Sequence, residues 1–119
     1  MLIFAGFFMS MGIMDRYSKC IKTMYGLRRF GIKLGLSTIK SMMHGLGNPQ
    51  DSFSCIHVAG TNGKGSIASF LASILKESNY RVGLYTSPHL ISFTERIKIN
   101  NSEISKSDVI KLTSLLKEK

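Results

Sequence analysis

The chain has 119 residues, enough for one small domain and its core. Sixteen Lys and Arg residues against seven Asp and Glu residues give a net charge of +9, which favours anionic partners: nucleotides, polycarboxylates, nucleic acid or an acidic membrane surface. Two cysteines, Cys20 and Cys55, lack the spacing of a metal site or redox pair, so we expect a cytoplasmic protein in which Cys55 is a small core residue.

The first residues, "MLIFAGFFMSMGIM", are strongly apolar but too few to span a bilayer, which needs about 20 residues. No basic residues precede the run and no clear cleavage site follows it, although a signal peptide or an interfacial anchor stays an alternative. We interpret residues 1–13 as an extension outside the fold, with the folded part over residues 14–119. Seven basic residues lie between Arg16 and Lys40, but no RNA-binding motif accompanies them, and we expect no nucleic-acid partner.

Apolar periodicity then predicts helices and strands in alternation. Ser37 is expected to cap the second helix, and the letters "NNSE" predict a hairpin turn. The predicted elements are helices over residues 15–25, 37–46, 66–79 and 106–117, and strands over residues 53–59, 81–85 and 97–100.

A strand, a glycine-rich turn, a helix and another strand form a βαβ unit. This order predicts an α/β nucleotide-binding fold in which strands Cys55–Ala59 and Val82–Tyr85 pair in parallel, joined by the helix from about Ser66. The ligand is then expected at the carboxyl ends of the strands. Two or three strands make only part of such a sheet, so the chain looks like the front of a larger protein.

The turn itself, "HVAGTNGKGS", predicts a phosphate-binding loop. Gly60, Gly63 and Gly65 let the main chain approach an anion closely. The N–H groups of Gly63 to Ser66 are expected to face a phosphate at the positive end of the helix, and Lys64 adds a full charge. An ordinary βα turn is the alternative, but a lysine between glycines, with an apolar strand before and an amphipathic helix after, favours the phosphate loop.

The hydroxyl of this loop is displaced. In the common phosphate loop the residue after the lysine binds Mg²⁺ through its hydroxyl, and here that residue is Gly65. Either Ser66 takes this role or another hydroxyl is brought in. Ser87 follows the next predicted strand, so it is expected at the same edge of the sheet, with Pro88 stiffening the turn. A plain turn serine remains the alternative for Ser87.

The letters "HVAGTNGKGS" followed by "LYTSPHLISFTERIKIN" closely resemble folylpolyglutamate synthases and bifunctional dihydrofolate synthases of the Mur ligase superfamily. The upstream "YGLRRFGIKLGLSTI" and "LGNPQ" are also similar to the N-terminal segment of that family. The loop alone is shared across Mur-type ligases, whereas its combination with "TSPHL" and "TERI" is specific to the folate branch. The resemblance covers residues 17 to about 104.

The resemblance implies an ATP-dependent ligase that phosphorylates a folate or dihydropteroate carboxylate and lets the amine of L-glutamate attack the acyl phosphate. Residues 14–119 would then be the N-terminal portion of the ATP-binding domain, and Lys64 the catalytic residue. Ser87 would bind Mg²⁺. The loop beside the pterin substrate would be Pro88 to Arg96. The ATP phosphates would be held by Thr61, Asn62, Gly63, Lys64, Gly65 and Ser66, and the candidate substrate-loop residues are Pro88, His89, Glu95 and Arg96.

The family's other Mg²⁺ ligands, its modified lysine and its C-terminal domain have no counterpart in these 119 residues. We therefore expect this chain alone to be inactive and the full-length relative to be a monomeric ligase. The alternatives are another Mur-type amide ligase and a non-catalytic nucleotide- or RNA-binding remnant. Two further expectations are that His57 packs in the core and that His44 lies on a surface helix. Glu95 and Arg96 pairing with each other is the alternative to a substrate contact.

Overall fold

The computed structural model describes residues 2–26 and 35–118, with side chains from Gly12 onward in the first helix. The chain divides into two compact units. Unit 1 comprises Met1–Cys55 and Lys106–Lys119, and unit 2 comprises Ile56–Ser105. Each unit has its own helices and its own contacts.

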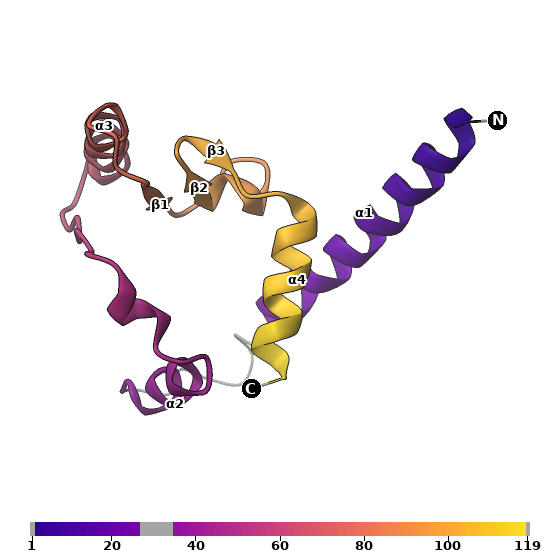
Figure 1. Ribbon diagram of the computed structural model, residues 1–119, viewed down its shortest axis with the longest axis horizontal. Coiled ribbons are helices and arrows are strands. Elements are labelled where there is room, and N and C mark those ends of the chain that lie inside the picture. Colours follow the sequence, from indigo (N-terminus) through magenta and orange to yellow (C-terminus); the bar gives the residue numbers. More distant parts are fainter. Residues whose placement is uncertain (1, 27–34, 119) are drawn as a thin grey trace. The chain divides into compact units, whose positions relative to one another are not determined.

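Unit 1 is built on two long helices. Helix α1 runs over Leu2–Gly26 and helix α4 over Lys106–Lys117, and α4 lies against the C-terminal half of α1 (Figure 1). Cys20 and Val109 are the buried apolar residues at this contact, 8% and 3% exposed, and the Cys20 sulfur lies 3.9 Å from the Val109 carbonyl oxygen. The last helix was predicted over the same residues, and its bounds are confirmed.

Polar groups at the α1–α4 contact are satisfied within it. The buried Thr113 hydroxyl donates to the Val109 carbonyl at 2.8 Å, one turn back, and lies 3.7 Å from the Met24 sulfur. The Lys106 ammonium lies 3.1 Å from the Met14 sulfur and 5.4 Å from the centre of the Tyr17 ring. A buried hydroxyl that bonds inside its own helix costs little, so the small contact tolerates Thr113.

Helix α1 continues across the boundary predicted between residues 13 and 14. It begins at Leu2, so the stretch expected to be an extension is helical and continuous with the helix predicted from Asp15. Its separation from the folded part stays a prediction. None of the described helices is both long enough and apolar enough to cross a membrane.

Helix α2 runs over Ser37–Gly45 and is followed by a short 3₁₀ helix, η2, over Pro49–Ser52. The predicted capping role of Ser37 is wrong, because Leu36 occupies the cap and its carbonyl accepts from Lys40 N–H at 2.9 Å. Ser37 is therefore already inside the first turn. The chain leaves α2 through Gly47, at φ +79°, next to the end predicted for this helix at residue 46. The basic loop between α1 and α2 lies largely outside the described residues.

Unit 2 contains helix α3 and a small sheet. Helix α3 runs over Lys64–Glu77, β1 over Gly83–Tyr85, the 3₁₀ helix η3 over Phe93–Arg96, β2 over Ile97–Ile99 and β3 over Ser102–Glu103. The sheet order is β1-β2-β3 and both pairs are antiparallel, with Tyr85 opposite Ile97 and Ile99 opposite Ser102. Asn100 and Asn101 turn the hairpin at φ +48° and +67°, which confirms the turn predicted from "NNSE".

The predicted parallel pair is absent from the described residues. Residues 53–59 belong to no strand or sheet, and β1 pairs with β2 instead. Phe53 and Ile56 are 63% and 62% exposed, and Cys55 and His57 are exposed too, so the core positions predicted for these two residues are wrong. A hairpin partner close in sequence costs little loop entropy, whereas a parallel strand needs a distant neighbour and cover on both faces.

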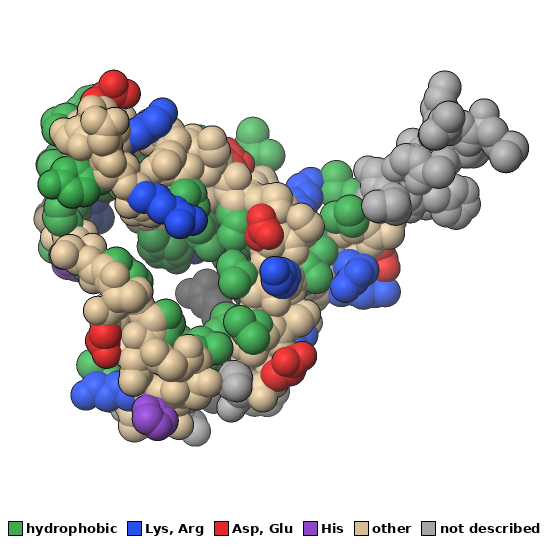
Figure 2. Space-filling view, in the orientation of Figure 1, with side chains coloured by type: hydrophobic (Ala, Val, Ile, Leu, Met, Phe, Trp, Pro, Cys, Tyr) green, Lys and Arg blue, Asp and Glu red, His purple; other side chains and the backbone are tan. Residues whose placement is uncertain are grey.

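Helix α3 is apolar on two sides. One side, with Ala72 at 4% exposed, packs toward β1 within unit 2. The other side, which we call the α3 stripe, consists of Ile67, Phe70 and Ile74, exposed by 51%, 69% and 62%. Hydrophobic side chains gather on the surface over α3 (Figure 2). Helices that are apolar around most of their circumference are normally covered on both sides, so the α3 stripe is a surface made for burial.

We predict that the α3 stripe binds the dye ANS at neutral pH, because ANS fluoresces on exposed apolar surface. Replacing Phe70 and Ile74 together by glutamine should lower the dye signal strongly without loss of helix content, since glutamine is a good helix former. Fluorescence titration together with circular dichroism measures both. Tyr80→Gln is the matched control, because Tyr80 is 64% exposed but lies beyond the helix. An equal loss of signal in the control variant would contradict a role for the stripe.

Candidate functional site

The loop Gly60–Ser66 leads from the extended segment directly into α3. Gly63 is the N-cap of the helix, with φ +75° and ψ 0°. This is a left-handed backbone conformation that residues other than glycine rarely adopt. A Cβ placed there would meet nothing within 4 Å, so the backbone angle and not crowding requires glycine. The first helical hydrogen bond runs from Ile67 N–H to the Gly63 carbonyl at 3.0 Å.

Lys64, the first residue of α3, folds back over the loop. Its ammonium donates to the carbonyl oxygens of Gly60 at 2.5 Å and Thr61 at 2.9 Å. The cation therefore lies at the same end of α3 as the N–H groups of the first turn, which have no partners inside the helix. A lysine charge beside the positive end of a helix dipole makes this end of α3 strongly attractive to an anion.

All residues of the predicted phosphate loop from Thr61 to Ser66 are exposed, and nothing lies within 4 Å of a Cβ built on Gly65. The loop is therefore accessible to a ligand from solvent. The structure brings together the predicted residues Thr61, Asn62, Gly63, Lys64, Gly65 and Ser66 as one continuous turn and helix start. Their contact with phosphate stays a prediction.

Ser87 lies just beyond the end of β1. The preceding residue, Thr86, still donates to the Arg96 carbonyl at 2.9 Å, after which the chain leaves the sheet. Ser87 is exposed and belongs, like the loop Gly60–Ser66, to unit 2, where α3 packs against β1. Its predicted metal role is untested by these contacts and stays a prediction.

Glu95 organises the segment after Ser87. Its carboxylate accepts hydrogen bonds from the backbone N–H groups of Ser92 at 2.6 Å, Ile91 at 2.8 Å and Leu90 at 2.9 Å. Those bonds, from Ser92 first and then from Leu90 and Ile91, hold the pKa of the Glu95 carboxyl below its ordinary value of 4.5. Ser92 and Glu95 form a capping box at the start of η3. The spacing Ser-x-x-Glu in "SFTE" is the sequence signal that could have predicted this role.

Arg96 and His89 form a second cluster in the same segment. Arg96 Nε donates to His89 Nδ1 at 2.7 Å, and the guanidinium lies 5.7 Å from the centre of the Phe93 ring. His89 meets the same ring edge-on at 6.3 Å. No ion pair joins Glu95 to Arg96 among the described residues, so the alternative that they pair with each other is wrong. Each is engaged inside the loop by a different partner.

Thr94, buried at 7% exposed, connects this loop to the hairpin. Its hydroxyl donates to Glu103 Oε2 at 2.9 Å and lies 3.0 Å from the Ser92 hydroxyl. Sequence reasoning missed Thr94 and Glu103, because their meeting depends on the β2–β3 turn and not on a spacing in the chain. The result is a loop held at both ends while Leu90 and Ile91, 93% and 92% exposed, project from it.

Comparison with known proteins gives this geometry a context. A dihydrofolate synthase/folylpolyglutamate synthase of Bacillus subtilis is 42% identical to the chain over 101 residues. The chain is similar to folylpolyglutamate synthases and dihydrofolate synthases. The folylpolyglutamate synthase structure of Thermotoga maritima matches 86% of the chain at 40% identity with a TM-score of 0.77. A structure described as a folylpolyglutamate synthase complex with AMPPCP and folate matches the same share at 34% identity with a TM-score of 0.74.

The resemblance to these synthases predicted from the sequence is confirmed. The chain spans about a quarter of the relatives' length, 24% of the Bacillus subtilis protein and 23% of the Thermotoga maritima chain. No protein-family model matches the chain. The likeness to the synthase structures shows a mixed arrangement of helices and a small sheet; it does not extend to a parallel sheet in the described residues.

Metal-binding capacity in the described part of the chain is limited. No group of three or more His, Cys, Asp or Glu side chains there is arranged to hold an ion. Ser66 and Ser87 offer neutral hydroxyls, which contribute single ligands to Mg²⁺ whose remaining positions are filled by phosphate oxygens and water. The donor set fits a metal that arrives with a nucleotide and does not fit an independent metal centre.

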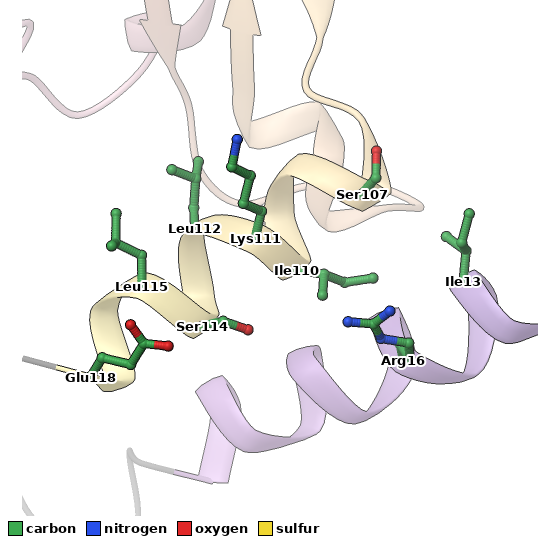
Figure 3. Close-up of a pocket in the computed structure, with 9 residues that line it drawn as sticks. All are labelled: Ile13, Arg16, Ser107, Ile110, Lys111, Leu112, Ser114, Leu115 and Glu118. Carbon is green, nitrogen blue, oxygen red and sulfur yellow. The ribbon is translucent and has the colours of Figure 1, made fainter.

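Unit 1 contains a groove between α1 and α4. It has a volume of about 470 Å³ and contains none of the predicted site residues (Figure 3). Its lining combines four apolar side chains with two serines, two basic side chains and one acidic side chain: Ile13, Arg16, Ser107, Ile110, Lys111, Leu112, Ser114, Leu115 and Glu118. It belongs to unit 1 alone and offers no nucleophile with an adjacent base.

We predict that the order of residues 90–92 depends on the ionised Glu95 carboxylate. Because the folded-state pKa is lowered, the stabilisation is complete above about pH 4.5 and disappears as the pH falls through the lowered value. Glu95→Gln should weaken it at neutral pH, since the amide NH₂ group cannot accept the third N–H bond and the remaining carbonyl oxygen carries no full charge. Hydrogen exchange of the Leu90, Ile91 and Ser92 amides, followed by NMR, measures the effect.

Glu77→Gln provides the matched control for the Glu95 measurement, because Glu77 lies at the exposed end of α3. The control should leave exchange at residues 90–92 unchanged at every pH. Equal protection in Glu95→Gln and the unsubstituted chain at neutral pH would show that the carboxylate does not hold the loop.

Proposed function

We propose that the chain supplies the phosphate-binding part of an ATP-dependent ligase that adds L-glutamate to a folate. The observation that carries the proposal is the Lys64 ammonium folded over a glycine loop at the start of α3. Its support is the similarity to synthases, one of which is described in complex with AMPPCP and folate. Residues 14–119 would form the N-terminal portion of the ATP-binding domain.

The loop residues act by binding and by orienting charge. The N–H groups of Gly63, Gly65 and Ser66 would donate hydrogen bonds to phosphate oxygens, and Lys64 would exchange the Gly60 and Thr61 carbonyls for the terminal phosphates. Bound ATP supplies the phosphoryl group that converts the folate carboxylate into an acyl phosphate, which glutamate then attacks through its amine. Lys64 stabilises the charge that develops during the transfer.

Ser87 is our proposal for the hydroxyl that reaches the metal. Gly65 stands where the common loop carries its hydroxyl, so the ligand must come from elsewhere. Ser87 is exposed just after β1, whereas Ser66 lies in the first turn of α3 among the N–H groups that face an anion. Ser87 would complete the coordination of Mg²⁺ held mainly by phosphate oxygens, and Ser66 would bind phosphate.

We propose that the segment from Pro88 to Arg96 lies beside the pterin ring of the substrate. Glu95 and Arg96 are engaged with loop partners, so their role would be to shape this segment and not to touch the substrate. The exposed Leu90 and Ile91 would then present apolar surface to the ligand. His89, which accepts from Arg96, would support the loop.

We further propose that residues 53–59 join a parallel sheet in a protein of the relatives' length. The α3 stripe supports this, because a sheet next to α3 would bury Ile67, Phe70 and Ile74. Burying most of three such side chains stabilises a fold by several kcal/mol, at about 25 cal/mol per Å² of apolar area. ANS binding by the stripe should then vanish in the longer protein.

A chimera tests the function. This chain would replace the matching quarter of the Bacillus subtilis relative, and ATP-dependent glutamate addition to folate would be assayed. We expect ligation by the chimera and none by the 119-residue chain alone, since the chain spans only a quarter of such a protein. A correctly folded chimera that binds ATP without ligating would favour the non-catalytic alternative. Cytoplasmic location and a monomeric full-length protein stay predictions.

We predict that Lys64→Ala abolishes ligation in the chimera. The described loop offers no second cation at this helix end. A charge-assisted contact contributes about 1.5–3 kcal/mol, so ATP affinity should fall roughly tenfold to a hundredfold, with a larger effect on turnover. Isothermal titration and steady-state kinetics separate the two. Lys76→Ala, at the other end of α3, is the control and should retain activity. Near-normal turnover of Lys64→Ala would be incompatible with its assignment.

Two serine variants separate the metal role from the phosphate role. Ser87→Ala should raise the Mg²⁺ concentration required for turnover and leave nucleotide binding without metal largely intact. Ser66→Ala should instead weaken nucleotide binding with or without Mg²⁺. Titration of each variant with AMPPCP at several Mg²⁺ concentrations checks both. If Ser66→Ala shifts the Mg²⁺ requirement and Ser87→Ala does not, the metal belongs to Ser66.

A further inference from the structure

Helix α1 has two halves of different chemistry. It is one continuous helix of 25 residues, and residues 2–14 contain no charged residue. At 1.5 Å per residue these thirteen positions make an apolar helix about 20 Å long, shorter than the hydrocarbon core of a bilayer at about 30 Å. Every charged residue of α1 lies in the second half: Asp15, Arg16, Lys19 and Lys22.

Within unit 1, α4 packs against α1 from about Ile13 onward. Contacts to α4 are made by Met14, Tyr17, Cys20 and Met24. The N-terminal half extends past the end of α4 (Figure 1). The contact with α4 therefore begins at about Ile13, and the apolar run before it lies on the part of α1 that extends past α4.

The charge next to the apolar half is positive. Arg16, Lys19 and Lys22 are exposed and follow one another at intervals of three, along one side of the helix. Asp15 forms an ion pair with Lys19 at 2.8 Å, which offsets part of this positive charge. Arg16 also lines the α1–α4 groove, together with Lys111 of α4. The remaining charged residue of the groove lining is Glu118 (Figure 3). Residues 1–40 carry seven basic residues and one acid, a net charge of +6.

We propose that the N-terminal half of α1 inserts into the surface of an anionic membrane, with Arg16, Lys19 and Lys22 at the level of the lipid phosphates. Stable attachment to a membrane surface takes two signals, an apolar insertion and a basic cluster, and α1 has both in sequence. A second copy of this chain is a poorer occupant, because it brings the same positive charge to the contact. This inference is independent of the proposed ligase activity.

A single tryptophan tests the insertion. The chain contains none, so Phe8→Trp places one unambiguous fluorophore in the apolar half. Vesicles of phosphatidylcholine with phosphatidylserine should shift its emission to shorter wavelength, and vesicles of phosphatidylcholine alone should shift it much less. Phe70→Trp in the exposed α3 stripe is the control and should keep its emission. Equal shifts in both variants would show unspecific adhesion of apolar surface and overturn the proposal.

A charge-matched pair of triple variants tests the basic cluster. Arg16→Gln, Lys19→Gln and Lys22→Gln together should lower the partition coefficient on anionic vesicles about a hundredfold, from the known contribution of each basic residue near such a surface. Lys76→Gln, Arg81→Gln and Lys117→Gln change the net charge equally but lie elsewhere, and should lower it far less. Equal losses would mean that net charge alone attracts the chain.

Three further outcomes of the vesicle experiment decide for or against membrane insertion. A loss of the emission shift at high salt supports the proposal, because screening weakens the charge contacts. A shift that appears without vesicles and grows with protein concentration identifies a second copy as the occupant and overturns it. An emission unchanged by any vesicle overturns it as well.

Discussion

The left-handed turn at Gly63, with the Lys64 ammonium bonded to the Gly60 and Thr61 carbonyls, determines how α3 begins. Because the turn places the lysine over the loop that precedes it, one short segment presents a full positive charge and the partner-free N–H groups of a helix start to solvent. The same bonds give Lys64 partners when no anion is present. A phosphate would replace two neutral carbonyl acceptors by charged ones, which strengthens each hydrogen bond.

The second ordered loop of unit 2 uses the opposite charge. Glu95 collects three backbone N–H groups, and Arg96 is engaged with His89 and Phe93. Glu95 and Arg96, which the family resemblance made candidates for substrate contact, thus maintain the shape of the loop. What they expose is the apolar pair Leu90 and Ile91. Specificity for a flat aromatic ligand would then come from loop shape and apolar contact more than from direct ion pairing.

Both units bury few of their described apolar side chains. Among the described apolar residues, Cys20, Ala72 and Val109 are the ones buried. The exposed α3 stripe in unit 2 and the apolar N-terminal part of α1 in unit 1 call for different partners, because α3 packs toward a sheet and α1 carries a basic cluster in its second half. A sheet offers α3 a matching apolar face, whereas lipid accepts an apolar helix next to positive charge.

The sequence by itself determined the features that depend on neighbours in the chain: the helix after the glycine loop, the Asn100–Asn101 turn, the bounds of α4 and the resemblance to folate-glutamate ligases. These follow from local backbone preferences and spacing, which short segments carry unaided. Only the tertiary structure decided that residues 53–59 remain unpaired and that Cys55 and His57 are exposed. It also decided that the Glu95 carboxylate accepts from backbone N–H groups and does not pair with Arg96. Strand pairing and side-chain partners depend on which distant segments meet, and the cost of closing those loops is not written in any local pattern.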